Sequence, residues 1–469
     1  MKRKTMLMLW LLWWAASAQG QVTLELERTV RNLHTQDALK HATLCVSVYD
    51  ASTGQPVYAY DANRSVTPAS VMKLLTTGTG FARLGSDFRF TTRLLMRGDT
   101  DRDGVLHGDL YIVGGGDPLL GSYRFKQTQH EALFAQWAEA IRKRGIRRIA
   151  GSVRYNESLF SGAQQHDSWQ LGDVGNYYGA GASALNFHEN MYFAYFNAGS
   201  SIGDPATLDD TQPRGLGLME HNQVTTGAAK SGDQVIAYGL NSSNERLYTG
   251  TVPLGASHFG VRVAMPHPAA SCATLLATYL RKQGIGVDKD TEPAATLPDS
   301  VRTLSEYYSP VFRQIAQYTN QTSNNLYAES IFKYLGHHCH GDGSFAGGAN
   351  AITAYLKEKK VEASGVNIVD GSGLSRLNSV TADFLGRYLV MLAHEPFFDA
   401  FLSSLRTASN PAVHYKTGTM TGVKAQAGYV VANGRKMAYA VIINHAEQAS
   451  REAAEAVERI VQQIAQLAK

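Results

Sequence analysis

The sequence predicts a multi-domain α+β protein in which one domain is interrupted by a long inserted region. The chain has 469 residues, which is too many for one small core. A β-hairpin followed by a helix is expected near the start, and a second such pair near the end. Between them, residues 90–270 are rich in Gly, Tyr and short alternating runs. We therefore expect the two ends to form one domain and the middle to be inserted into it.

The first expected elements surround a short serine-lysine motif. Residues 42–61 alternate around a turn-rich centre, which is typical of a β-hairpin. The next segment, "TPASVMKLLTTGTGFARLG" at 67–85, has Pro68 near a plausible helix start and apolar residues at helical spacing. Ser70 is therefore expected at a junction between a strand and a helix.

The last elements are expected to be a hairpin and an amphipathic helix. Residues 425–445 form two alternating runs joined by Asn433-Gly434, a strong hairpin signal. Residues 451–469 place their apolar side chains on one face, which should pack on that sheet rather than on a membrane. The expected organisation is a signal peptide at 1–18, a principal domain of 22–92 and 275–469, and an inserted α+β region at 93–274.

Charge and cysteine content exclude some classes of protein. The net charge of +4 is spread along the chain, so nucleic acid is not an expected partner. Cys45, Cys272 and Cys339 allow at most one disulfide, so the fold cannot depend on a disulfide framework. Whether any pair is bonded stays open.

The N-terminus predicts secretion. Three basic residues at 2–4 precede "MLMLWLLWWAA", an apolar run too short to span a bilayer comfortably, and "ASA" at 16–18 offers a cleavage site. This pattern predicts a signal peptide and a mature chain that starts near Gln19. An uncleaved anchor is the alternative, which leaves peripheral membrane association open.

Three short patterns point to nucleophilic catalysis. In "SVMK", Ser70 and Lys73 are three residues apart and project from one side of a helix, so the lysine can act as a base if it is kept neutral. "TSNNLYAE" supplies Ser323 for proton relay and Asn325 for holding a carbonyl. "HYKTGTMTG" supplies Lys416, a second cation whose repulsion favours a neutral Lys73.

Each pattern also occurs elsewhere by chance. Copies are found at Ser330 to Lys333, Ser242 to Asn244 and Lys230 to Gly232. Only the patterns at Ser70, Ser323 and Lys416 give the order Ser-x-x-Lys, Ser-x-Asn and Lys-Thr-Gly. Only there do a helix start and a terminal hairpin fall where the chemistry needs them. This order is the one found in penicillin-binding proteins and class A β-lactamases.

Further motifs identify a family. They are "HGDLYIVGGGDPLL", "NYYGAGASALN", "TGTVPLG", "DGSGLSRLN" and "KTGTMTGV". From about residue 30 to 465 the chain resembles the type-C low-molecular-mass penicillin-binding proteins, the D-alanyl-D-alanine carboxypeptidase/endopeptidases of the penicillin-binding protein 4 group. The resemblance implies a penicillin-binding/β-lactamase-like transpeptidase domain, with an antiparallel five-stranded sheet flanked by helices, and two nested inserted domains.

The resemblance also implies an activity. It implies a periplasmic serine DD-peptidase that acts on the stem peptides of peptidoglycan, needs no cofactor and is acylated by β-lactams. A homodimer is left open. Ser70 would be the nucleophile and Lys73 its base, with the backbone N–H groups of Ser70 and Thr419 as the oxyanion hole. Ser323 would relay a proton to the leaving D-alanine, with support from Lys416.

The same resemblance assigns substrate contacts. Asn325 would hold the amide on the acyl side, Thr417 and Thr419 would face the terminal carboxylate, and Gly418 would leave room for an extended peptide. Asp173 matches the position where relatives place an acidic residue near the free amine of the stem peptide's diamino acid. A turn-capping aspartate is the alternative for Asp173.

Two motifs that mimic metal sites are discounted. "DTDRDG" at 99–104 begins like a calcium loop but has Leu110 where glutamate is required, so a hairpin turn is expected. "HHCH" at 337–340 consists of adjacent residues, which rarely converge on one ion, and a polar loop after a helix is expected. No metal is predicted.

Two other functions compete with the peptidase. A β-lactamase would need a glutamate for fast deacylation, and no E-x-x-x-N motif lies at a persuasive place between Ser70 and Ser323. A non-catalytic wall-binding protein would not need Lys73 or Lys416. The sequence leaves open the preference between carboxypeptidase and endopeptidase activity and the identity of the diamino acid.

Overall fold

The computed structural model describes residues 21–408 and 412–468, which form two compact units. Among these residues, the first unit comprises 21–86, 313–323, 349–408 and 412–468. The second comprises Asp87–Phe312 and Asn324–Gly348. The predicted signal peptide at 1–18 lies outside the described residues.

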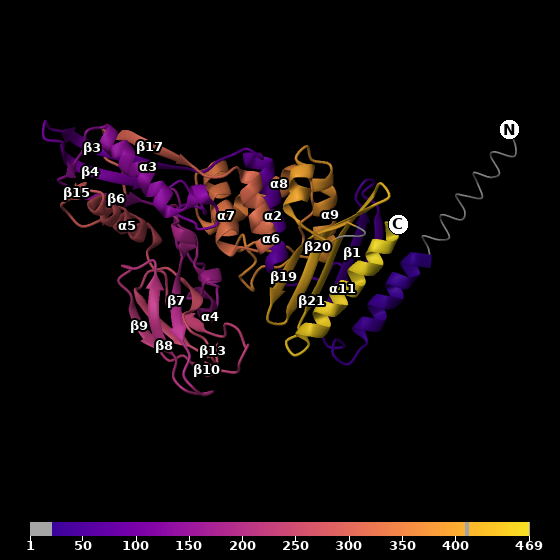
Figure 1. The fold of residues 1–469 in the computed structure, drawn as a ribbon. Coiled ribbons are helices and arrows are strands. Elements are labelled where there is room, and N and C mark those ends of the chain that lie inside the picture. Colours follow the sequence, from indigo (N-terminus) through magenta and orange to yellow (C-terminus); the bar gives the residue numbers. More distant parts are fainter. Residues whose placement is uncertain (1–20, 409–411, 469) are drawn as a thin grey trace. The chain divides into compact units, whose positions relative to one another are not determined.

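A six-stranded antiparallel sheet forms the centre of the first unit, in the order β18-β19-β20-β21-β1-β2 (Figure 1). Its strands are β1 (Thr43–Asp50), β2 (Pro56–Tyr60), β18 (Arg406–Ala408), β19 (Ala412–Met420), β20 (Val423–Ala432) and β21 (Arg435–Asn444). The two predicted hairpins are confirmed as the pairs β1–β2 and β20–β21. Asn433 and Gly434 have φ of 51° and 77°, as a two-residue hairpin turn requires. The family resemblance implied five strands, whereas the structure has six among the described residues.

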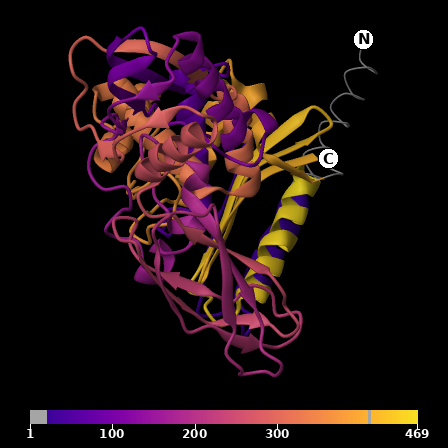
Figure 2. The same ribbon diagram turned by 60° about the vertical axis from the view of Figure 1, so that its left-hand side comes forward.

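The pairing of β1 with β21 joins the two ends of the chain in one sheet. Helix α11 (Ser450–Leu467) and a helix over residues 21–34 lie side by side on one face (Figure 2). Their apolar side chains share a core with alternate residues of β1 and β21, such as Val46 and Val441. The predicted C-terminal helix is confirmed, whereas the helix at 21–34 was not predicted.

Helix α9 (Ala382–Ala393) packs against the opposite face of the same sheet. A Cβ on Gly386 would lie 2.7 Å from the ring of Tyr49 on β1, so this position requires glycine. The remaining helices of the first unit are η1 (Ala69–Met72), α2 (Lys73–Leu84) and α10 (Phe398–Ser404), while α6 (Phe312–Thr322) and α8 (Phe345–Glu358) each include residues of both units.

The second unit contains a seven-stranded sheet with the path β15-β5-β4-β3-β17, in which β6 pairs with β4 and β16 pairs with β6 (Figure 1). These strands are β3 (Thr91–Thr100), β4 (Val105–Val113), β5 (Arg148–Ile149), β6 (Val153–Asn156), β15 (Gly286–Val287), β16 (Glu292–Pro293) and β17 (Arg302–Tyr308). Because β17 pairs with β3, residues 275–312 belong to this unit. The chain therefore returns to the first unit at Arg313, later than the predicted residue 275.

Three small sheets complete the second unit, in the orders β14-β7-β8, β11-β12-β9 and β10-β13. Their strands are β7 (Met191–Asn197), β8 (Thr207–Gln212), β9 (Met219–Asn222), β10 (Thr225–Gly227), β11 (Ile236–Tyr238), β12 (Glu245–Thr249), β13 (Thr251–Pro253) and β14 (Phe259–Ala264). One hydrophobic core runs from the large sheet into the small ones. The division of this region into two nested domains stays a prediction.

The helices of the second unit are η2 (Lys126–Thr128), α3 (His130–Lys143), α4 (Leu171–Val174), η3 (Tyr177–Gly179), η4 (His188–Asn190), α5 (Pro268–Lys282) and α7 (Asn325–His340). The prediction of a loop at 337–340 is wrong, because these residues form the last turn of α7 before Gly341, which has φ of +72°. The "DTDRDG" segment is the predicted hairpin turn, closed by Asp101 Oδ1, which accepts hydrogen bonds from two backbone N–H groups.

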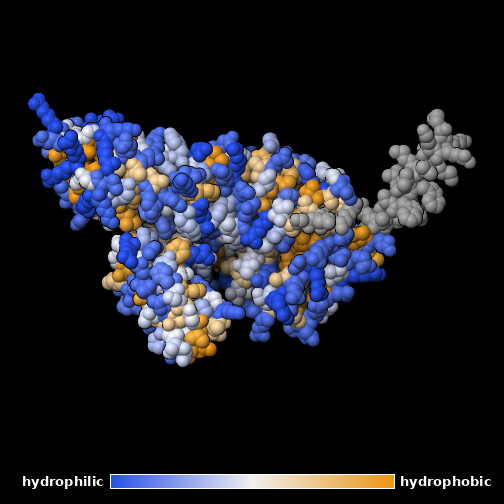
Figure 3. All heavy atoms as spheres, viewed as in Figure 1, coloured by the Kyte–Doolittle hydropathy of each residue, from blue (hydrophilic) through white to orange (hydrophobic). Residues whose placement is uncertain are grey.

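No helix within residues 21–408 and 412–468 combines the length and the apolar composition that are needed to cross a membrane. The face drawn in Figure 3 is mostly hydrophilic, with hydrophobic residues in small groups.

Candidate active site

Ser70 and Lys73 meet at a change of helix type. Ser70 lies in the 3₁₀ turn η1, and α2 begins at Lys73. In a 3₁₀ turn the side chains of residues three apart eclipse each other, because there are three residues per turn. The Lys73 Nζ donates to Ser70 Oγ at 2.9 Å and to the carbonyl of Ser372 at 2.7 Å. Ala69, the residue before the serine, has φ of +48°, a strained backbone conformation of the kind that gathers at functional sites.

Ser323 and Lys416 form a second serine-lysine pair in the same unit. Ser323 follows α6 with φ of +60°, and Lys416 lies on β19. The Lys416 Nζ donates to Ser323 Oγ at 2.8 Å and to the carbonyl of Thr417 at 2.7 Å. Each serine hydroxyl therefore accepts a hydrogen bond from its own lysine amine.

The electrostatics of this pair favour a neutral amine. Lys416 is only 1% exposed, and burial lowers its pKa well below the ordinary value. The positive charges of Lys73 and Arg406 lower the pKa of Lys416 further. The sequence predicted repulsion between Lys416 and Lys73, and in the structure this repulsion acts on Lys416.

Gly418 brings β19 against the turn that carries Ser70. A Cβ on Gly418 would lie 2.6 Å from the carbonyl oxygen of Pro68 and 3.1 Å from the backbone nitrogen of Ser70. Among the described residues, the edge strand β18 pairs with β19 only from Val413 to Tyr415. The edge of β19 beyond Tyr415 is therefore available to an extended peptide that would pair with it.

On strand β19, the side chains of Thr417 and Thr419 lie on the opposite face from that of Lys416. Side chains alternate along a strand, and Tyr415 on β19 packs against the core beneath α11. Thr417 borders a groove of about 540 Å³ whose other wall includes Glu458 and Val461 of α11. Contact between these threonine hydroxyls and a substrate carboxylate therefore stays a prediction.

The loop after α8 supports Lys73, and sequence analysis gave it no role. Its carboxylate Asp370 is fully buried and accepts hydrogen bonds from the backbone nitrogens of Gly373 and Ser375 at 2.7 and 2.6 Å. This turn presents the carbonyl of Ser372 to Lys73 Nζ. The turn lies in "DGSGLSRLN", which sequence analysis used as a family motif without assigning it a contact with Lys73.

Asn325 and Asp173 belong to the second unit and both adjoin Tyr178. The Asn325 Nδ2 donates to the carbonyl of Tyr178 at 2.8 Å. Burial raises the pKa of the Tyr178 hydroxyl, and the negative charge and hydrogen bond of Asp173 raise it further. The two predicted substrate contacts of this unit are thus linked through one tyrosine, and Asp173 lies in the short helix α4.

A buried carboxylate holds the start of α7, which carries Asn325. Glu189 accepts hydrogen bonds from Tyr327 Oη at 2.8 Å and from Arg124 Nε at 2.7 Å. The side chain of Asn324 caps the helix by accepting from the backbone nitrogen of Tyr327. Sequence analysis did not identify Glu189.

The chance copy of the serine-lysine pattern has a different environment. Ser330 and Lys333 are both fully buried in α7. The Ser330 Oγ accepts from Asn186 Nδ2 at 3.1 Å, and Lys333 Nζ donates to the carbonyl of Ala163 at 3.0 Å. The two residues therefore use their polar groups on different partners.

Comparison with known proteins identifies relatives over almost the whole chain. The model of the D-Ala-D-Ala carboxypeptidase 3 (S13) family matches residues 26–464. A D-alanyl-D-alanine carboxypeptidase of Actinomadura sp. (strain R39) is 29% identical over 455 residues, which are 92% of this chain and 82% of the relative. D-alanyl-D-alanine carboxypeptidase DacB of Haemophilus influenzae is 24% identical over 410 residues, 83% of each chain.

Solved structures share the fold. The crystal structure of penicillin binding protein 4 (dacB) from Haemophilus influenzae superposes with a TM-score of 0.79 at 21% identity, covering 93% of this chain and 99% of the other. The same protein complexed with a novel beta-lactam has a TM-score of 0.75 at 20% identity, covering 94% and 99%. These matches confirm the predicted fold class.

Proposed function

The chain belongs to the D-Ala-D-Ala carboxypeptidase 3 (S13) family and is a serine-type D-Ala-D-Ala carboxypeptidase, and we propose that it acts through an acyl-enzyme at Ser70. The observation that carries this proposal is the pairing of two serine hydroxyls with two lysine amines in one unit, Ser70 with Lys73 at 2.9 Å and Ser323 with Lys416 at 2.8 Å. A serine hydroxyl becomes a good nucleophile only when a base removes its proton.

In the acylation step, Lys73 takes the proton of Ser70 as its Oγ attacks the carbonyl between the two D-alanines. Two buried ammonium groups repel each other, so the pair formed by Lys73 and Lys416 favours one neutral amine. The backbone N–H groups of Ser70 and Thr419 stabilise the negative oxygen of the tetrahedral intermediate. The approach of Gly418 to the nitrogen of Ser70 supports this placement.

In the leaving step, Ser323 gives a proton to the nitrogen of the departing D-alanine and is reprotonated from the lysine pair. Lys416 keeps the hydroxyl of Ser323 in position. Water then attacks the ester carbonyl, Ser70 regains its proton, and the shortened peptide leaves. The same steps would cleave a D-alanyl cross-link if the leaving group were the side-chain amine of a diamino acid.

The substrate is the stem peptide of peptidoglycan, held as an extended strand beside Gly418 on β19. Asn325 binds the amide on the acyl side, and Thr417 and Thr419 bind the terminal carboxylate. Asp173 binds the free amine of the diamino acid, and its link with Asn325 through Tyr178 supports this role.

The proposed location is the periplasm, reached through the signal peptide at 1–18. β-Lactams acylate Ser70 as substrate mimics, which the β-lactam complex of the Haemophilus protein supports.

The nucleophile is tested with labelled penicillin. Wild-type protein should bind one label per chain, and Ser70→Ala should bind none. Ser330→Ala is the matched control, because Ser330 has the same spacing to a lysine but lies buried in α7. Labelling of Ser70→Ala would refute the assignment, as would loss of labelling in a folded Ser330→Ala.

The reaction is tested by mass spectrometry of muropeptides incubated with wild type and Ser70→Ala. Release of D-alanine from pentapeptides establishes carboxypeptidase action, and loss of cross-linked dimers establishes endopeptidase action. Sustained turnover of a chromogenic cephalosporin would instead favour a β-lactamase.

A further inference from the structure

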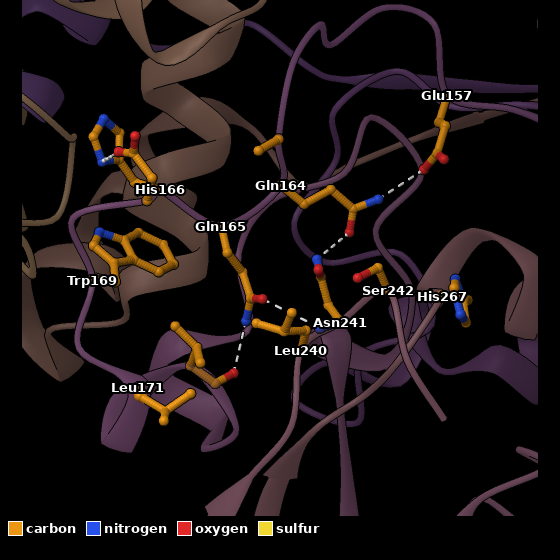
Figure 4. Close-up of a pocket in the computed structure, with 13 residues that line it drawn as sticks. Glu157, Gln164, Gln165, His166, Trp169, Leu171, Leu240, Asn241, Ser242 and His267 are labelled. Atoms are coloured by element: carbon orange, nitrogen blue, oxygen red, sulfur yellow. Dashed lines mark hydrogen bonds and ion pairs between the residues drawn. The ribbon is translucent and has the colours of Figure 1, made fainter. Parts of the chain in front are cut away.

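A cavity of about 530 Å³ opens within the second unit beside α4 (Figure 4). Its walls come from 157–174, from 240–242 and from His267. Figure 4 shows Trp169 and Leu171 on one side, with Asn241, Ser242 and His267 on the other. Its volume is in the range that holds a small organic ligand rather than a single ion.

Side-chain amides hold the walls of this cavity in place. The Gln164 Oε1 accepts from Asn241 Nδ2 at 2.7 Å, and its Nε2 donates to Glu157 Oε2 at 3.1 Å. Gln165 is buried, donates to the carbonyls of Val174 and Gly179, and accepts from the backbone nitrogen of Asn241 at 3.2 Å. The loop that carries Asn241 is therefore fixed before any ligand arrives, which reduces the entropy lost on binding.

Several hydrogen-bond acceptors that line the cavity can accept further hydrogen bonds. Glu157 Oε2 binds Gln164 and Ser183, and Asn241 Nδ2 binds Gln164. Glu157 Oε1, Asn241 Oδ1 and the Ser242 hydroxyl have no hydrogen-bond partner among residues 21–408 and 412–468. A ligand that donates several hydrogen bonds would match this set.

The charge of the lining disfavours anions. The lining includes the carboxylates Glu157 and Asp167 and no lysine or arginine among the described residues. Its apolar part includes Leu171 and Leu240, which are 67% and 51% exposed, together with Ala163, Val174 and Trp169, of which Trp169 is only 7% exposed. The lining thus combines hydrogen-bond acceptors with apolar surface that a ligand with nonpolar faces would cover.

We propose that this cavity binds one or two uncharged sugar rings of the N-acetylated amino-sugar type. Such a ring donates hydrogen bonds through its hydroxyl and acetamido groups and presents C–H faces to the exposed side chains of Leu171 and Leu240. An amine would satisfy Glu157 but leave most of the cavity and its apolar walls unfilled. The inference rests on the proposed function, because the glycan strands of peptidoglycan consist of such sugars and carry the stem peptides. The second unit would thus bind the glycan.

The binding test uses Ser70→Ala protein that starts at Gln19 and the neutral disaccharide N,N′-diacetylchitobiose. Of the two tryptophans after residue 20, Trp169 lines the cavity and Trp137 does not, so a saturable change in emission is expected from Trp169. Asn241→Ala should weaken binding about fivefold or more, because it removes both a ligand acceptor and the bond to Gln164. Asn244→Ala is the matched control, because it lies in the same loop but does not line the cavity.

Each outcome decides the inference. Saturable binding that Asn241→Ala weakens and Asn244→Ala preserves supports it. No saturable change, equal binding by both variants, or displacement of the disaccharide by 1,5-diaminopentane but not by free N-acetylglucosamine overturns it.

A second measurement separates this inference from the proposed function. With Ser70 present, Asn241→Ala should release D-alanine from a free pentapeptide at the wild-type rate. Its KM for a pentapeptide attached to glycan should rise about fivefold, with kcat unchanged. If the free pentapeptide is not cleaved by wild type, the proposed function fails while the sugar site stands. Equal KM values for the glycan-attached substrate overturn the sugar site alone.

Discussion

Lys333 makes the pH dependence of stability a direct test of the structure. Its side chain is fully buried in α7, and burial lowers the pKa to about 8 from an ordinary 10.5, against the raising effect of Glu329. In the unfolded chain the ordinary pKa returns. The difference between about 8 and 10.5 corresponds to roughly 3 kcal/mol.

The sign follows from the number of protons bound in each state. Between pH 8 and 10.5 the unfolded chain keeps a proton on Lys333 that the folded chain releases. The free energy of unfolding therefore rises with pH across this window, by up to roughly 3 kcal/mol. Below pH 8 both states carry the proton, so this residue contributes no slope.

The assay compares urea unfolding of wild type and Lys333→Met at pH 7.5, 8.5, 9.5 and 10.5. In protein that starts at Gln19 the tryptophans are Trp137 and Trp169, and both lie in the second unit, so their emission follows the unit that contains Lys333. As pH rises, the unfolding free energy of wild type should increase relative to that of Lys333→Met. The matched control is Lys282→Met, which removes an exposed lysine of α5 in the same unit.

The result that would refute this reasoning is a difference between wild type and Lys333→Met that stays constant from pH 7.5 to 10.5. An equal pH-dependent change in Lys282→Met would also refute it, because the effect would then not come from burial. Loss of the bond to the Ala163 carbonyl shifts the difference by a constant and leaves its slope unchanged.

Three further predictions concern the candidate site and its support. In Gly418→Ala the new Cβ would meet the Pro68 carbonyl at 2.6 Å, so β19 must shift and stopped-flow acylation by penicillin should slow about tenfold or more. Glu189→Gln removes a buried charge with three hydrogen-bond donors and should lower the unfolding free energy in urea by about 2–4 kcal/mol. Arg406→Ala removes a positive charge that lowers the pKa of Lys416, so the pH profile of acylation should move to higher pH, by about a few tenths of a unit.

Local patterns predicted the parts of the fold whose cause is local. The hairpin at Asn433-Gly434 follows from two residues that accept positive φ, and α11 follows from apolar residues at helical spacing. The helix start at Pro68 was also recovered from residue types alone. Its first turn is nevertheless a 3₁₀ turn, a difference that residue spacing does not reveal.

The rest depends on contacts between distant segments. The second unit keeps residues up to Phe312 because β17 pairs with β3, about 200 residues earlier in the chain. The composition of β17 and β3 does not indicate that these two strands pair with each other. The Ser372 carbonyl that accepts a hydrogen bond from Lys73 likewise belongs to a loop about 300 residues later in the chain. Every residue has a backbone carbonyl, so residue type does not indicate this contact.

The two copies of the serine-lysine pattern show what the spacing alone does not specify. In the 3₁₀ turn, residues three apart are one full turn apart, so Lys73 lies over Ser70 and donates to its hydroxyl. In α7, three residues span only about five-sixths of a turn, and Lys333 reaches the Ala163 carbonyl instead. Lys416 is a second cation that interacts with Lys73 of the first copy. A serine with a nearby lysine therefore becomes a candidate nucleophile only where the backbone aligns the two side chains and a second cation favours a neutral amine.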